Sequence, residues 1–113
     1  MGNEILVWTD VASAAVLEPH GRTLIKHAQL EIVVFRHAEK LYALEDRCPH
    51  QGASLCIGQI EGGHVKCPSH GLRFRLTDGL LACSAADSAA TSMGVRTFPV
   101  RVVNGDLQIA MPP

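Results

Sequence analysis

Apolar, β-forming residues recur along this chain in short runs separated by polar or turn-forming residues. One run covers Glu4–Thr9, and three more follow at Arg22–His27, Glu31–His37 and Lys40–Leu44. Short strands at regular spacing, with turn signals between them, are typical of all-β sandwiches and barrels. No longer stretch keeps a helical period. The pattern therefore predicts an all-β fold of antiparallel sheets.

Three glycine-containing dipeptides predict tight turns in the second half of the chain. Asp-Gly and Asn-Gly favour two-residue hairpin turns because both central residues need a positive φ. The last turn lies between two further apolar runs, which predicts a closing hairpin. The turn signals are Gly62-Gly63, Asp78-Gly79 and Asn104-Gly105, and the closing strands are Thr97–Val103 and Asp106–Ala110.

Two segments interrupt the strand pattern. The stretch 10–15 is compatible with a single helical turn that Pro19 would stop. The stretch Ser84–Ser92 is rich in alanine and serine and is predicted to be a loop. Neither segment carries residues with obvious chemistry.

Length, composition and charge narrow the class of protein. A chain of 113 residues is expected to form one domain, residues 1–113. Ten Lys and Arg against eleven Asp and Glu give a net charge of −1, which argues against nucleic-acid binding. A hydrophobic content of 47% argues against disorder. No apolar run approaches the roughly 20 residues that span a membrane.

The cysteines and histidines are the unusual part of the inventory, with four and six copies. The N-terminus lacks the basic and apolar regions of a signal peptide, which predicts a cytoplasmic protein. Thiols stay reduced in that compartment. Four cysteines there indicate metal or redox chemistry more than a disulfide framework.

Two short motifs contain four of these ten residues. They are Cys48-Pro-His50-Gln-Gly52 and Cys67-Pro-Ser-His70-Gly71, separated by sixteen residues between His50 and Cys67. Each motif offers one thiolate and one imidazole, on a segment predicted to be a loop. Glycine allows close backbone approach to a bulky ligand, and proline stiffens each loop.

A set of two cysteines and two histidines has three interpretations. Structural zinc sites usually pair like ligands locally, as C-x2–4-C followed by H-x3–5-H, whereas each motif here mixes the two types. A [2Fe–2S] cluster in which two histidines replace two cysteines on one iron fits the mixed motifs better. The third interpretation is four unrelated residues. The repeated Cys-Pro with a nearby His and Gly favours the cluster.

At this point the chain resembles the Rieske-type [2Fe–2S] proteins. Beyond the two motifs, the resemblance includes the lead-in 41–47 and the ending 97–101. It implies a Rieske-like fold of antiparallel sheets with two cluster-binding loops and one [2Fe–2S] cluster. Cys48 and Cys67 would hold the inner iron, and His50 and His70 the outer iron through Nδ1.

Departures from high-potential members of that family indicate a low-potential type. Ala53 and Ser69 stand where those proteins carry a disulfide, and Leu72 and Phe74 stand where they carry hydroxyl donors near the cluster. Hydrogen bonds to the sulfurs raise the potential. Their loss implies a value near the low end of the Rieske range, about −150 mV. The other two thiols, Cys56 and Cys83, are expected to be free, and the alternative is a disulfide between them, which requires Cα atoms within about 7 Å.

The resemblance implies a function in electron transfer and no catalysis by this chain alone. In size the chain is similar to the ferredoxins that take electrons from a ferredoxin reductase and pass them to a Rieske non-haem iron oxygenase. The alternative is the small Rieske-like subunit of an assimilatory nitrite reductase. Of the charged residues beside the loops, Arg47 and Arg73 are the stronger candidates for partner contacts.

Overall fold

The computed structural model describes residues 6–18, 20–27, 29–46, 54–67, 73–80 and 94–112. In these ranges the chain forms β-strands and one short 3₁₀ helix, η1. The elements are β1 Val7–Ser13, η1 Ala14–Leu17, β2 Arg22–His27, β3 Leu30–His37, β4 Lys40–Glu45, β5 Gln59–Glu61, β6 His64–Lys66, β7 Arg73–Arg75, β8 Thr97–Phe98, β9 Val100–Val103 and β10 Asp106–Met111. No helix in the described ranges has the length and apolar character needed to cross a membrane.

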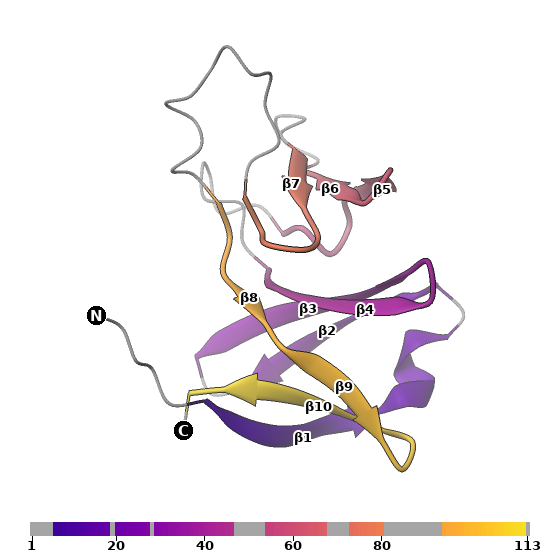
Figure 1. The fold of residues 1–113 in the computed structure, drawn as a ribbon, viewed down its shortest axis with the longest axis vertical. Coiled ribbons are helices and arrows are strands. Elements are labelled where there is room, and N and C mark those ends of the chain that lie inside the picture. Colours follow the sequence, from indigo (N-terminus) through magenta and orange to yellow (C-terminus); the bar gives the residue numbers. More distant parts are fainter. Residues whose placement is uncertain are drawn as a thin grey trace.

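The strands form three antiparallel sheets that lie one above another (Figure 1). The lower sheet has the order β1-β10-β9, the middle sheet β2-β3-β4-β8, and the small upper sheet β5-β6-β7. The predicted all-β fold is therefore confirmed. The strands expected at 22–27, 31–37 and 40–44 are β2, β3 and β4, each within one residue of its predicted bounds.

The central part of β3, residues 32–35, is buried on both faces, and this explains its four consecutive apolar residues. Side chains alternate between the two faces of a strand. Ile32 and Val34 accordingly pack against the lower sheet, whereas Val33 and Phe35 pack toward the upper one. The middle sheet thus separates two hydrophobic cores.

Each hydrophobic core contains residues from several strands that are far apart in the sequence. The lower core consists of Leu17, Ile25, Ile32, Val34, Ala43, Phe98, Leu107, Ile109 and Met111. The upper core consists of Val33, Phe35, Leu44, Leu55, Val65, Cys67, Phe74, Leu76 and Val95. The upper core fastens the small sheet to the middle sheet.

The predicted closing strand 97–103 is wrong as a single element. It is divided at Pro99 into β8, which pairs with β4 in the middle sheet, and β9, which pairs with β10 in the lower sheet. Proline has no N–H to donate to a ladder, so a strand can change partners there at little cost. The Pro99 carbonyl still accepts from Ala110 N at 3.0 Å.

The helical turn expected at 10–15 is also largely wrong. Strand β1 continues through this stretch to Ser13, paired with β10, with an irregularity between Asp10 and Ala12. Long-range pairing with β10 overrides a weak local helical preference. Only at Ser13 does the chain turn helical, where the hydroxyl accepts from Ala15 N and caps η1. Pro19 lies outside the described residues.

Two of the three predicted hairpin turns have the expected form. Gly62-Gly63 joins β5 to β6, and Asn104-Gly105 joins β9 to β10. At Asp78-Gly79 the turn is wider, because Arg75 N donates to the Leu80 carbonyl at 2.9 Å across four residues. Gly79 has φ +74°, and a Cβ there would lie 2.1 Å from the Val95 carbonyl oxygen, so only glycine fits.

Candidate metal centre

One of the four predicted ligands lies in the described part of the structure. Cys67 directly follows β6 and is fully buried in the upper core. Cys48, His50 and His70 lie outside the described residues, as does the predicted loop at 84–92. Within the described ranges no three or more His, Cys, Asp and Glu side chains gather as they would around a metal ion.

The ends of the first ligand segment, residues 47–53, border the upper core. The segment follows Asp46 at the end of β4 and leads into Ser54. Leu44, just before it, and Leu55, just after it, both belong to the upper core with Cys67. The packing therefore brings both ends of this segment toward the cysteine of the other motif.

The second ligand segment, residues 68–72, joins two paired strands. Lys66 of β6 is the register partner of Arg73 of β7, and Val65 pairs with Phe74. The upper sheet thus fixes where the segment starts and where it ends. Together, the two segments start and end over one core, which fits a cluster that takes ligands from both.

The surroundings of Cys67 suit a thiolate ligand of an inner iron. The side chain packs among apolar residues and has no exposed surface. An unpaired thiolate in such a place would be costly, whereas a metal-bound thiolate is stabilised by the metal charge. The four predicted ligands, two cysteines and two histidines, are of the residue types that a Rieske cluster requires.

Asp46 ties the two ends of the first ligand segment to each other. Its Oδ2 accepts from Ser54 Oγ and its Oδ1 accepts from Cys56 N, both at 2.7 Å. Its own N–H donates to the Glu31 carbonyl at 2.8 Å, which fixes Asp46 to the middle sheet. The residue is only 7% exposed.

Arg22 also binds the residues that follow the first ligand segment. Its Nη1 donates to the carbonyls of Cys56, at 2.8 Å, and Gly58. The guanidinium lies 5.0 Å from the centre of the Phe35 ring, a cation–π arrangement. At Gly58 a Cβ would lie 2.4 Å from the Lys66 carbonyl oxygen, so the stretch also packs closely against β6.

The environment of Cys56 differs from that of Cys67. Cys56 is partly buried and packs at the margin of the upper core as a free thiol. Burial is the main cause that raises the pKa of Cys56, the Asp46 carboxylate adds to it, and Arg22 opposes it. A raised pKa keeps this thiol protonated near neutral pH, which suits packing more than metal binding. Cys83 lies outside the described residues.

Charged side chains cover the outer face of the upper sheet. Exposed Arg73, a candidate for partner contact, has its Nε 3.0 Å from Glu61 Oε1. Arg75 makes two hydrogen bonds to the Asp78 carboxylate, at 3.0 and 2.6 Å. These bonds hold the pKa of Asp78 below its usual value. Arg47 lies outside the described residues.

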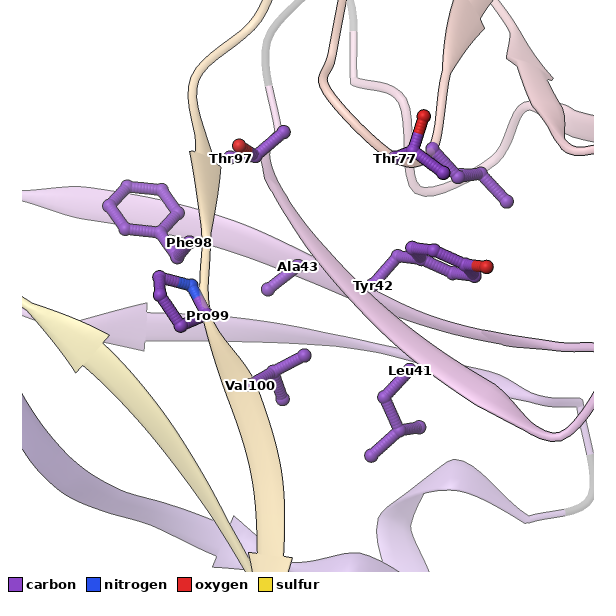
Figure 2. Close-up of a pocket in the computed structure, with 9 residues that line it drawn as sticks. Leu41, Tyr42, Ala43, Thr77, Thr97, Phe98, Pro99 and Val100 are labelled. Atoms are coloured by element: carbon purple, nitrogen blue, oxygen red, sulfur yellow. The ribbon is translucent and has the colours of Figure 1, made fainter.

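A cavity of about 290 Å³ lies where the middle sheet meets the turn after β7. Figure 2 shows Tyr42 and Leu41 of β4 on one side and Thr97 to Val100 on the other, with Thr77 above. The polar side-chain groups among the described lining residues are the Thr77, Thr97 and Tyr42 hydroxyls. The described lining residues include no carboxylate, imidazole or thiol, so they offer none of the usual metal ligands.

Asp46 and Arg22 do not stand out in the sequence as site residues. Asp46 belongs to the lead-in to the first motif, where an acidic residue near a turn is usually solvated. Arg22 begins a strand that is 34 residues away from Cys56. The only sequence signal for Asp46 is its place two residues before Cys48.

Comparison with known proteins gives consistent matches. The family model described as the Rieske [2Fe-2S] domain matches residues 7–99. Ferredoxin CarAc of Metapseudomonas resinovorans is 31% identical, covering 92% of this chain and 94% of its own. The 3-phenylpropionate/cinnamic acid dioxygenase ferredoxin subunit of Escherichia coli strain K12 is 35% identical, with 83% and 85% covered. A chain in the solved complex of reduced oxygenase and oxidized ferredoxin in carbazole 1,9a-dioxygenase has 29% identity and a TM-score of 0.77, with 94% of each chain covered.

Proposed function

Because this chain belongs to the Rieske [2Fe–2S] domain family, we propose that it is a one-electron carrier. It takes electrons from a ferredoxin reductase and delivers them to the terminal component of an oxygenase system. Its cofactor is one Rieske-type [2Fe–2S] cluster, and the chain is not an enzyme by itself. Residues 1–113 would form a single domain around that cluster.

The observation that supports this proposal most directly is the burial of Cys67 where both ligand segments begin and end. In the proposed site Cys48 and Cys67 hold the inner iron, and His50 and His70 the outer iron. When bound, the cluster accepts and releases one electron. Cys67 keeps its side of the site free of water, because the upper core surrounds it.

A complete set of four protein ligands leaves no open position on either iron for a substrate. Transfer of electrons is then the chemistry that such a site supports. The relatives described above are named as ferredoxins or ferredoxin subunits, two of them of dioxygenases. This favours the carrier over the nitrite reductase subunit. We place the carrier in the cytoplasm, where its thiols stay reduced.

Reconstitution tests the carrier function. The purified protein, a ferredoxin reductase and an oxygenase component encoded near its gene are mixed with NADH and substrate. Product formation is expected to depend on this chain and to fall to background without it. A protein that purifies with zinc and no iron, or a cluster that the reductase cannot reduce, would contradict the proposal.

The reduction potential is expected near the low end of the Rieske range, about −150 mV. Leu72 and Phe74 offer no hydroxyl to the cluster sulfurs, and Phe74 is fully buried in the upper core. Fewer hydrogen bonds to the sulfurs leave the reduced state less stabilised. Protein-film voltammetry measures this directly, and a midpoint above roughly +100 mV would show the inference to be wrong.

A further inference from the structure

We propose that Asp46 is a positioning residue for the cluster. Its carboxylate links the described residues that flank segment 47–53, and we expect this link to set how the segment presents Cys48 and His50 to the irons. This inference rests on the proposed function, because it assigns a role toward the cluster of that function. Within the described ranges, the hydrogen bonds that link the two sides of the segment join Asp46 to Ser54 and Cys56.

The geometry connects one side of the segment to the other. Asp46 precedes the segment, and its two carboxylate oxygens accept hydrogen bonds from Ser54 Oγ and Cys56 N beyond it, each at 2.7 Å. The backbone of Asp46 is bound to Glu31 of β3. The Cys56 carbonyl in turn accepts from Arg22 of β2. Both ends of the segment are therefore fastened to the middle sheet.

The hydrogen bonds to Ser54 and Cys56 account for the burial of the Asp46 carboxylate. Asp46 is the one buried polar or charged side chain in the described ranges, and no cation there forms an ion pair with it. Burying a carboxylate costs free energy unless hydrogen bonds compensate. Within the described ranges, the two donors to this carboxylate are Ser54 Oγ and Cys56 N, so its hydrogen bonds form only when the residues on the two sides of the segment are together.

Closure of the segment has a direct consequence for metal binding. A loop whose flanking residues are hydrogen-bonded to each other loses less conformational entropy on binding a metal than a loop whose ends are free. Residues that orient metal ligands from outside the coordination shell typically contribute about 10–100-fold to metal affinity. We therefore expect that breaking this tie releases iron faster and alters the ligand arrangement.

Four variants distinguish the loss of the Asp46 hydrogen bonds to Ser54 and Cys56 from general effects of substitution. Asp46→Ala removes both hydrogen bonds, and Ser54→Ala removes one. Asp46→Asn keeps an acceptor for Cys56 N and places an amide opposite the Ser54 hydroxyl, so both contacts persist. Asp10→Ala is the matched control, because Asp10 accepts one hydrogen bond, from Gln108 Nε2 at 2.8 Å, on the distant lower sheet.

The measurements are the rate of iron release to a ferrous chelator and the EPR spectrum of the dithionite-reduced holoprotein. We expect D46A to release iron about 10-fold faster than the unaltered protein, with S54A between them. D46N and D10A should stay within about twofold of the unaltered protein. The EPR spectrum of D46A should shift or broaden, whereas that of D10A should superimpose on the original.

Equal release rates in D46A and D10A would overturn the inference, as would a D46N variant as fast as D46A. Should D46A fail to fold, S54A decides: faster release with a changed spectrum supports the tie, and unchanged behaviour refutes it. Unaltered protein that purifies without iron would instead refute the proposed function, and the inference with it. A normal cluster in the unaltered protein together with an unaffected D46A refutes the tie alone.

Discussion

Replacing Cys67 with alanine is expected to abolish the cluster. Cys67 is one of two proposed thiolate ligands of the inner iron, and its side chain is completely buried, so no solvent ligand has ready access to the vacated position. The loss should exceed the roughly 10–100-fold effect of changes outside the coordination shell. Iron and acid-labile sulfide analysis should fall from about two of each per chain to near zero, with loss of visible absorption.

Cys56→Ala is the matched control for that experiment. It makes the same chemical change in the same region, at a free thiol whose raised pKa disfavours the thiolate. We expect C56A to keep its full iron content. A C67A protein that retains iron, or a C56A protein that loses it, would show that the cysteines are assigned to the wrong roles.

The second large effect is expected from Phe35→Ala. Phe35 is among the largest fully buried side chains and lies in the upper core, which joins the upper sheet to the middle sheet. Its ring also lies under the Arg22 guanidinium, which holds the stretch after the first ligand segment. Truncating a buried phenylalanine typically costs about 3–5 kcal/mol, a large part of the roughly 5–15 kcal/mol that stabilises a small domain.

Thermal unfolding of the holoprotein, followed by circular dichroism and by visible absorption, measures this loss. Ile57→Ala is the control, because Ile57 is 73% exposed and its truncation should change the free energy of unfolding by no more than about 0.5 kcal/mol. We expect F35A to lose its sheet and cluster signals at a much lower temperature than I57A. Equal midpoints would mean that the upper core contributes little to holding the two sheets together.

Local sequence accounts for much of the fold. Strands β2, β3 and β4 follow from apolar runs, and the turns at 62–63 and 104–105 follow from glycine chemistry. These features depend on residues that are near neighbours, so a single stretch carries the whole signal. Each Cys-Pro motif is equally local, and the two together are specific enough to indicate the family.

Long-range pairing explains the points where the local signal was wrong. The run 97–103 has strand character throughout, but Pro99 sends its two halves to different sheets. The stretch 10–13 has a weak helical preference, but β10 pairs with it. In both cases the deciding partner lies far away in the sequence, and no local pattern reports which partner a strand will meet.

Local patterns in the amino-acid sequence were enough to predict the class of this protein: an all-β chain with two mixed Cys–His motifs that fit a Rieske cluster. The packing of the three sheets, which no local pattern reveals, covers both faces of the central part of β3 and buries Cys67 completely, whereas Cys56 stays partly exposed. The tertiary structure also showed that Asp46 is buried and bound to Ser54 and Cys56. The physical reason is that burial and hydrogen bonding depend on residues such as Arg22 and Cys56, 34 positions apart, which only the folded chain brings together.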